Sequence, residues 1–268
     1  MYYLWNENEI PLIDKENPIC LPSIKPYIKD GAKSAVIVCP GGGYHSKAEH
    51  EGGPIAEFFN DCGISAFVLD YRVAPYKYPC PLIDAKRAVR FVRYNAEKFG
   101  IDKDKIGICG FSAGGHLAAM TLTSPENEAS EYNVNDETDS VSSKVNLGIL
   151  CYPVITSGEY AHKGSFNALC GDDNEELKEK LSLEKRVDDT TAPAFIWHTA
   201  NDNAVPSMNS LLFALELAKR KITYELHIFR DGRTDWDLPL KEATLPNGQS
   251  FAKRFLKISA GHKVKPLK

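Results

Sequence analysis

The sequence predicts an α/β protein whose central sheet is mostly parallel and carries helices on both faces. Short β-rich runs alternate with segments in which apolar residues recur at helical spacing, an order typical of α/β folds. The β-rich runs are largely apolar along their length, as expected for strands that are covered on both sides. The 268 residues are enough to bury such a sheet in one domain, 1–268.

The elements follow one another in a regular order along the chain. Residues 1–31 are rich in proline and β-formers, and we expect them to add antiparallel strands at one edge of the sheet. Helical spacing is clearest where Ala85, Ala88 and Val92 recur between basic residues. The predicted strands are 32–39, 65–70, 105–109, 145–152, 194–198 and 224–229, and the predicted helices are 55–62, 82–97, 110–122 and 207–220.

Two segments interrupt this alternation. Residues 124–143 are polar and acidic, which predicts an excursion over the surface. Residues 156–190 fit either a small cap over the edge of the sheet or a solvated connection, and the sequence leaves both open. A cap in this position would help to shape a substrate pocket.

Composition argues against several classes of partner. The net charge is −4, from 32 basic and 36 acidic residues scattered along the chain, so neither nucleic acid nor an anionic membrane is expected to bind. No apolar run approaches the roughly 20 residues that cross a bilayer. No CxxC or HExxH pattern is present, and the sequence predicts neither a metal nor another cofactor.

The cysteines and the N-terminus predict a cytoplasmic protein. The seven cysteines are odd in number, widely spaced and mostly embedded in apolar runs, which is typical of reduced, buried thiols. The first residues are acidic and lack the basic start and apolar stretch of a signal peptide. The expected partner is a small-molecule ester substrate, and a homo-oligomer is left open.

The pentapeptide Gly-Phe-Ser-Ala-Gly at 110–114 predicts a nucleophile, Ser112. It fits G-x-S-x-G, with a predicted strand before it and a helix after it. Glycines allow the sharp turn that lifts a serine hydroxyl above the sheet. The competing interpretation is a glycine-lined turn with an incidental serine.

A glycine run at 40–43 follows an earlier strand and predicts an oxyanion hole. The backbone N–H groups of Gly42, Gly43 and Ala113 are the expected donors, since bare backbone can point at a developing oxyanion. A phosphate-binding loop is the alternative for such a run, but neither G-x-x-x-x-G-K-[ST] nor G-x-G-x-x-G is present.

Asp202 is the predicted acid of a catalytic triad. It lies in the loop after the strand at 194–198, downstream of Ser112, which matches the chain order serine, acid, histidine. The alternative is a capping role for the helix that begins near Ser207.

Taken together, these motifs resemble the α/β-hydrolase superfamily, and within it the acetyl-xylan-esterase-like or lipase/esterase-like branch of small carbohydrate and carboxyl-ester hydrolases. The matching segments are 38–44, 51–56, 69–75, 78–85, 106–119 and 197–206. The resemblance implies an α/β-hydrolase fold and a serine esterase that needs no cofactor. It also implies a catalytic histidine in a His-Gly pair, placed two residues after a glycine that follows the last strand.

The sequence departs from this pattern at that point. Gly232 and Arg233 are followed by Thr234 and Asp235, so Thr234 occupies the position expected for histidine. A threonine hydroxyl does not titrate near neutrality and cannot act as the general base. Thr234 therefore marks a lost activity, a relocated base or an altered copy of the sequence.

No other histidine is an obvious replacement. His198 lies beside Asp202 and is the nearest candidate, although its match to the family favours a structural role. His116 is expected to descend from the nucleophile helix into the packing, and His227 to lie deep in its strand. His45 and His50 follow the glycine run and could reach the pocket rim, whereas the sequence does not place His162 and His262.

We therefore predict a serine esterase-type hydrolase of small acylated substrates, acetylated sugars among them, with low or lost activity. The alternative is a catalytically impaired relative that binds a ligand or a partner. A serine peptidase on the same fold is a weaker alternative, because the chain has no room for a large accessory domain.

Overall fold

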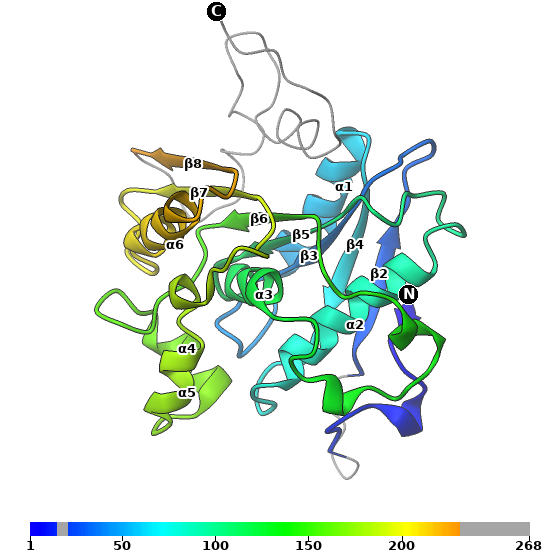
Figure 1. Ribbon diagram of the computed structural model, residues 1–268, viewed down its shortest axis with the longest axis horizontal. Helices are drawn as coiled ribbons and strands as arrows, with labels where there is room; N and C mark the ends of the chain where they lie inside the picture. The colour runs from blue at the N-terminus through cyan, green and yellow to red at the C-terminus, as the bar shows by residue number, and fades with distance from the viewer. Residues whose placement is uncertain (15–20, 231–268) are drawn as a thin grey trace, which may run out of the picture.

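The computed structural model describes residues 1–14 and 21–230. Eight strands form one sheet in the order β1-β2-β4-β3-β5-β6-β7-β8 (Figure 1). The first two strands, which lie within 1–31, pair antiparallel, and all the others pair parallel. The strands are β1 (Tyr2–Tyr3), β2 (Ser23–Tyr27), β3 (Ala35–Cys39), β4 (Ser65–Asp70), β5 (Ile106–Phe111), β6 (Leu147–Cys151), β7 (Ala194–Thr199) and β8 (Tyr224–Phe229). The mostly parallel sheet is confirmed.

Helices cover both faces of the sheet, as predicted. The α-helices are α1 (Gly53–Asp61), α2 (Cys80–Tyr94), α3 (Ser112–Thr123), α4 (Lys163–Cys170), α5 (Glu175–Lys180) and α6 (Met208–Lys219). One core contains the buried side chains of α2, α3 and α6, and a second contains those of α1 (Figure 1). Successive residues of a strand face opposite cores, because side chains alternate across a sheet. Ile37 of β3 joins the first core and Val38 the second.

Strand β5 ends two residues later than predicted. The predicted strand ended at Cys109, but pairing continues through Gly110 and Phe111, which lie opposite Leu150 and Cys151. The predicted helix accordingly begins at Ser112 rather than at Gly110. Gly110 interrupts the apolar run, so the predicted strand ended before it. Its lack of a side chain is required here, because α3 lies close to this position.

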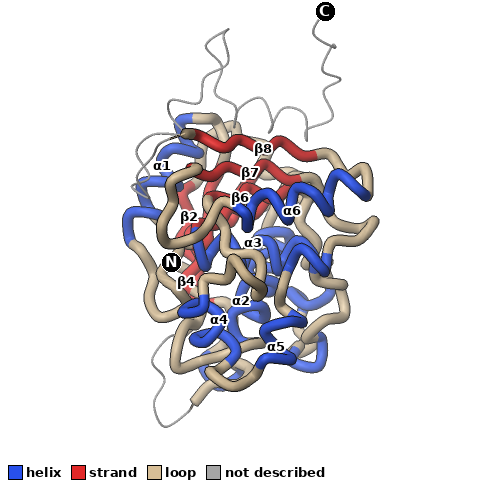
Figure 2. Tube along the Cα trace, turned by 90° about the vertical axis from the view of Figure 1, so that its left-hand side faces the viewer, coloured by secondary structure: helices blue, strands red, loops and turns tan. Residues whose placement is uncertain are grey.

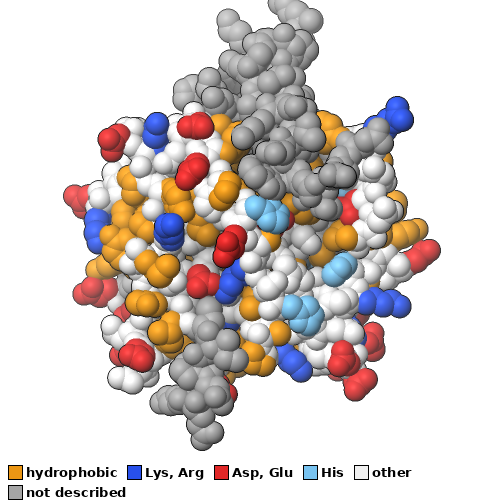
Figure 3. Space-filling view, turned by 180° about the vertical axis from the view of Figure 1, so that it is seen from behind, with side chains coloured by type: hydrophobic (Ala, Val, Ile, Leu, Met, Phe, Trp, Pro, Cys, Tyr) orange, Lys and Arg blue, Asp and Glu red, His pale blue; other side chains and the backbone are white. Residues whose placement is uncertain are grey.

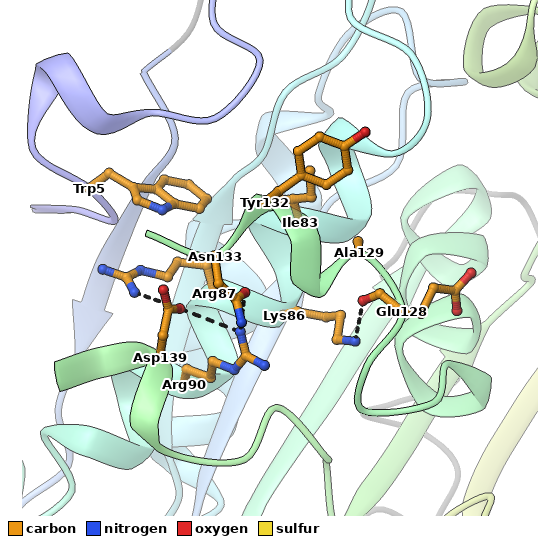
Figure 4. Close-up of a pocket in the computed structure, with 10 residues that line it drawn as sticks. All are labelled: Trp5, Ile83, Lys86, Arg87, Arg90, Glu128, Ala129, Tyr132, Asn133 and Asp139. Carbon is orange, nitrogen blue, oxygen red and sulfur yellow. Dashed lines mark hydrogen bonds and ion pairs between the residues drawn. The ribbon is translucent and has the colours of Figure 1, made fainter. Parts of the chain in front are cut away.

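The segment 124–143 is fastened to α2 by basic side chains. It contains two 3₁₀ turns, η3 (Ser130–Tyr132) and η4 (Glu137–Ser140). Lys86 Nζ donates to the carbonyls of Pro125, Glu126 and Glu128 at 2.9, 3.0 and 2.7 Å. Figure 4 shows Lys86, Arg87 and Arg90 lining a small cavity beneath the segment. Burial lowers the pKa of Lys86 to about 8.

The segment 156–190 is partly helical and reaches the loop after β3. It carries α4, α5 and the 3₁₀ turn η5 (Leu183–Arg186). A Cβ built on Gly43 would lie 4.0 Å from the hydroxyl of Ser165 in α4. The segment therefore borders the predicted oxyanion loop, as a cap would.

The surface carries no area of a single charge sign in the view from behind. Acidic and basic side chains are interspersed there with apolar ones (Figure 3). Among the described residues, none of the helices has the length and apolar character that crossing a bilayer requires.

Candidate active site

Ser112 occupies a strained turn between β5 and α3. Its φ is 51°, in the left-handed region that residues other than glycine seldom adopt. Two glycines make this turn sterically feasible. A Cβ at Gly110 would lie 2.0 Å from the carbonyl oxygen of Gly114, and a Cβ at Gly114 would lie 2.1 Å from that of Cys39. The pentapeptide thus holds Ser112 at the carboxyl end of the sheet, where ligands bind in folds of this class.

The glycine loop after β3 lies directly beside Ser112. A Cβ at Gly41 would come within 3.2 Å of the Ser112 Cβ, so the backbone approaches the serine closely. Gly42 and Gly43 have φ values of 131° and 66°, which favour glycine. The Gly42 carbonyl accepts from the N–H groups of His45 and Ser46 at 3.0 and 3.1 Å. Within the described residues, no hydrogen bond has the N–H of Gly42 or Gly43 as its donor.

A buried carboxylate positions this loop. Glu51 Oε2 accepts from the Gly41 N–H at 2.5 Å, and Glu51 Oε1 accepts from the Tyr152 hydroxyl at 2.7 Å. Burial raises the pKa of Glu51, although both hydrogen bonds counteract the rise. Sequence reasoning gave Glu51 no role. Its hydroxyl partner is 101 positions away, and no local pattern signals such a pair.

Asp202 has one carboxylate oxygen bound and one without a partner. Oδ1 accepts from the N–H groups of Ala204 and Val205 at 2.8 and 2.9 Å. Oδ2 is buried and has no hydrogen-bond partner among the described residues. Burial would raise the pKa of Asp202, but the nearby His198 and the two backbone bonds outweigh it and hold the pKa below its usual value. An ionised oxygen without a partner is what an imidazole N–H requires.

His198 does not meet the requirements of a relocated base. Its Nδ1 accepts from the Ser210 hydroxyl at 2.8 Å, and its Nε2 donates to the Val205 carbonyl at 2.8 Å. Both ring nitrogens are thus engaged, the side chain is fully buried, and Nε2 lies 3.6 Å from Asp202 Oδ2. His198 therefore fastens the Asp202 loop to α6, in line with the structural role that the sequence favoured.

His116 is likewise engaged at both nitrogens. Nδ1 accepts from the Tyr44 hydroxyl and Nε2 donates to the Leu181 carbonyl, each at 2.9 Å. Burial lowers the pKa of His116 from 6.5 to about 4, so the ring is neutral at pH 7. It joins the nucleophile helix to the glycine loop and to the segment 156–190.

The remaining predicted positions are dispersed. His162 Nδ1 accepts from the N–H of Ser165 at 3.2 Å and thus caps α4, close to the glycine loop. His45 and His50 are exposed after that loop, and His227 lies 3.5 Å from Glu225 on β8. Thr234 and His262 lie outside the described residues.

The described geometry can therefore supply part of a hydrolytic site. Ser112, the N–H groups beside it and the ionised Asp202 all lie at the carboxyl ends of neighbouring parallel strands, β3, β5 and β7 with β6 between. Among the described residues, His116 and His198 offer no nitrogen free to accept the serine proton.

Solved structures similar to this chain are hydrolases. The acetyl ester-xyloside bifunctional hydrolase from Caldicellulosiruptor lactoaceticus is 46% identical, with a TM-score of 0.82 and coverage of 96% of this chain and 93% of that one. MGS-M1, an α/β-hydrolase enzyme from a deep-sea metagenome library, is 27% identical, with a TM-score of 0.66 and coverage of 90% and 93%. The α/β-hydrolase fold predicted from the sequence is thereby confirmed.

Sequence comparisons agree. Residues 24–217 match the model of the BD-FAE family. Endo-1,4-beta-xylanase B of Butyrivibrio fibrisolvens is 38% identical over 237 residues, which are 85% of this chain and 36% of that protein. An acetylxylan esterase of Xylanibacter ruminicola is 33% identical over 178 residues, which are 64% of this chain and 34% of that protein. The chain thus spans about a third of the length of these two relatives.

Proposed function

The chain belongs to the BD-FAE family within the acetyl-xylan-esterase-like branch of the α/β-hydrolases, and we propose that it is a carboxylic-ester hydrolase in which Ser112 is the nucleophile. Small acylated molecules, acetylated sugars first among them, are the proposed substrates. The proposal includes a weak native activity, because Thr234 replaces the expected histidine.

One observation supports the nucleophile above all others. Ser112 adopts a φ of 51° although it is not glycine, and glycines at 110 and 114 are sterically required around it. Strain of this kind costs about 1–3 kcal/mol and persists where function maintains it. An incidental serine in a structural turn has no need for that conformation.

The proposed reaction proceeds through an acyl-enzyme. The Ser112 hydroxyl oxygen attacks the ester carbonyl carbon while its proton leaves to a base, and the N–H groups of Gly42, Gly43 and Ala113 hold the resulting oxyanion. The carbon–oxygen bond to the alcohol breaks, and the alcohol leaves with a proton. Water then attacks the acyl carbonyl carbon, the bond from that carbon to the Ser112 oxygen breaks, the carboxylic acid leaves, and the serine oxygen regains a proton.

The base is the incomplete part of this proposal. In a triad, the acid binds one ring nitrogen of a histidine, so that the other nitrogen takes the serine proton. Oδ2 of Asp202 is suited to the first contact, but Thr234 has no imidazole to offer it. On the subtilisin template, loss of the histidine lowers kcat by about 10⁶ and leaves the contribution of the oxyanion hole and of binding.

Acetylated sugars are favoured by the neighbours of this chain. The Caldicellulosiruptor structure is named for hydrolysis of acetyl esters and xylosides, and the Xylanibacter protein is an acetylxylan esterase. The segment 156–190 borders the glycine loop through Ser165, and we propose that it helps to select the alcohol part of the substrate.

A second candidate function rests on the absent imidazole. A chain that keeps the strained serine and the oxyanion donors can still bind an ester or its products without turning them over. Placement in the cytoplasm remains a prediction, and the six described cysteines without a disulfide are consistent with it.

Hydrolysis of p-nitrophenyl acetate and of acetylated xylo-oligosaccharides distinguishes the two functions. The esterase proposal expects slow turnover that disappears in Ser112→Ala, together with covalent labelling of Ser112 by an activated phosphonate ester. Equal rates in both proteins, with no labelling, would refute the proposal. Binding of acetylated xylo-oligosaccharide without any turnover in the native chain would establish the alternative.

A further inference from the structure

A groove of about 450 Å³ lies where α1 begins, beside β2 and β4. Helix α1 packs on both strands, and Figure 2 shows the three elements on the same side of the molecule. The volume falls in the range of about 300–1,000 Å³ that is usual for sites of small molecules. Six lining residues carry the argument, and we call them the β2–β4 groove: Lys25 and Tyr27 of β2, Asp70 of β4, and Pro40, Lys47 and Glu49 of the loop between β3 and α1.

The β2–β4 groove shares a loop with the surroundings of the nucleophile. A Cβ built on Gly41 would lie 3.2 Å from the Ser112 Cβ. Pro40, which precedes Gly41 and whose Cα is about 3.8 Å from that of Gly41, lines the groove. The Ala48 N–H donates to the Gly41 carbonyl at 2.9 Å, so the far end of the loop is fastened to the same point. A substrate whose ester lies at Ser112 can therefore extend into the groove.

The groove offers both donors and acceptors of hydrogen bonds. Lys47 Nζ donates to the Tyr71 carbonyl at 2.9 Å and forms an ion pair with Asp70. Lys25 and Glu49 are exposed. Because two lysines and two acidic residues line the groove, its charges balance and favour neither an anion nor a cation. Such a mixture suits a neutral ligand with many hydroxyl groups, since each hydroxyl both donates and accepts.

Tyr27 adds an aromatic ring to this polar lining. The residue is half-buried, and the Nζ of Lys25 lies 5.1 Å from the centroid of its ring. A Cβ built on Gly53 would lie 3.0 Å from the Tyr27 hydroxyl, so the start of α1 approaches the tip of the ring closely. A tyrosine combines an apolar ring face with a polar end. It can therefore contact both the C–H face and the hydroxyl groups of a sugar.

We propose that the β2–β4 groove binds the saccharide chain of an acetylated xylo-oligosaccharide, next to the sugar that carries the ester. The inference rests on the proposed function, because the ester of that sugar has to lie at Ser112. An acetyl group alone is too small to occupy a groove of this volume, whereas the adjoining sugars fill it. Binding of parts of the substrate remote from the scissile bond helps to orient the reacting group.

Each polar side chain of the groove has a role in this complex. Lys25 and Lys47 donate to sugar oxygens, and Glu49 and Asp70 accept from sugar hydroxyls. Hydrogen bonds with one charged partner are stronger than those between neutral groups. Lys47 and Asp70 already hold each other in place through their ion pair, so fewer side-chain rotamers have to be fixed when the saccharide binds.

Isothermal titration calorimetry with unacetylated xylobiose and xylohexaose tests the proposal without requiring turnover. We expect the native chain to bind xylohexaose about tenfold more tightly than xylobiose, because more sugars of the longer chain contact the groove. Lys25→Ala and Glu49→Ala are each expected to weaken xylohexaose binding about tenfold, as loss of a hydrogen bond with a charged group predicts. Both residues are exposed, so folding should not depend on them. Far-ultraviolet circular dichroism verifies this.

Lys33→Ala is the matched control. Lys33 is an exposed lysine that precedes β3, whereas the groove lies beyond the other end of that strand, so this variant should bind xylohexaose as the native chain does. Equal affinity of the native chain for the two saccharides, or xylohexaose binding that is unchanged in both groove variants, would overturn the proposal.

Labelling of Ser112 by an activated phosphonate ester reports on the proposed function separately. A chain that is labelled but does not bind xylohexaose would retain the nucleophile and refute the groove. A chain that is not labelled, but whose xylohexaose binding weakens in Lys25→Ala and Glu49→Ala, would support the groove and refute the nucleophile.

Discussion

The loop that carries Ser112 and the loop that carries Asp202 differ in which of their polar groups have hydrogen-bond partners among the described residues. Around Ser112, Glu51 accepts from the Gly41 N–H and His116 accepts from the Tyr44 hydroxyl, while the N–H groups of Gly42 and Gly43 have no partner among the described residues. Around Asp202, His198 and two backbone N–H groups fix the loop, yet one carboxylate oxygen has no described partner. We infer that both strand ends keep the arrangement that the proposed reaction needs, and that the imidazole that would connect them is missing because Thr234 takes its place in the sequence.

Restoring the histidine should have the largest effect. We expect Thr234→His/Asp235→Gly to raise kcat for p-nitrophenyl acetate by several orders of magnitude, towards the roughly 10⁶-fold range that a triad histidine supplies. Stopped-flow or steady-state assays measure the gain. Asp235→Gly alone is the control and should remain at the native rate, whereas equal rates in all three proteins would contradict the comparison.

The codons of this segment allow a genetic version of the same test. Thr234, Asp235, Trp236 and Asp237 are encoded by ACN-GAY-TGG-GAY, and the same bases read one nucleotide earlier give XAC-NGA-YTG-GGA, with X the preceding base. That frame permits His-Gly in the first two positions and requires Leu-Gly in the next two. Loss of one nucleotide, compensated by a gain downstream, thus converts His-Gly into Thr-Asp. An ACN-GAY frame in the gene of all independent isolates is the result expected for a fixed replacement, whereas CAC-GGA would show that Thr234 marks an altered copy of the sequence.

Removing the nucleophile should have the next largest effect. Ser112→Ala is expected to abolish the slow native turnover and, in the Thr234→His/Asp235→Gly chain, to cancel the gain in kcat. Ser46→Ala is a matched control, since Ser46 is an exposed serine of the glycine loop. Residual rates that are identical with and without Ser112 would place the chemistry elsewhere.

The free energy of unfolding should depend on pH through His116 of the nucleophile helix. The unfolded chain binds a proton near pH 6.5, whereas burial holds the pKa in the folded chain at about 4. Acidification from pH 6.5 to 4 therefore favours unfolding, by about 3 kcal/mol from this one group. Urea unfolding measures it, and His116→Gln should lose this part of the slope. An unchanged slope in the variant would show that His116 is not held neutral.

Loss of the Glu51 carboxylate, which positions the glycine loop, should have a smaller effect on kcat. Glu51→Ala leaves the Gly41 N–H and the Tyr152 hydroxyl without partners, so we expect a loss of about 2 kcal/mol in unfolding free energy and a fall in kcat of about tenfold or more. Glu51→Gln can keep both hydrogen bonds through its amide and should retain most of the activity. A loss as large in Glu51→Gln would instead indicate that the charge is required.

The sequence predicted what short-range patterns encode. Apolar runs between helical segments predicted the parallel sheet. The spacing of the glycines around Ser112 predicted the sharp turn that carries the serine. The partners of Glu51 and of both buried histidines could not be predicted, because each joins segments that are distant in the chain. His198 illustrates the limit: its position beside Asp202 suggested a stand-in base, but the Ser210 hydroxyl that occupies its Nδ1 comes from the next helix.

We propose that Asp202 is retained to orient an imidazole that the sequence no longer supplies at position 234. The most direct measurement compares kcat/KM for Asp202→Asn in the native chain and in the Thr234→His/Asp235→Gly chain. Asparagine can still accept the Ala204 and Val205 bonds through its amide oxygen, so the loop should survive. We predict almost no change in the native background and a loss of about 10⁴-fold in the restored one, as in a triad whose aspartate is replaced. The same fractional loss in both backgrounds would contradict the account.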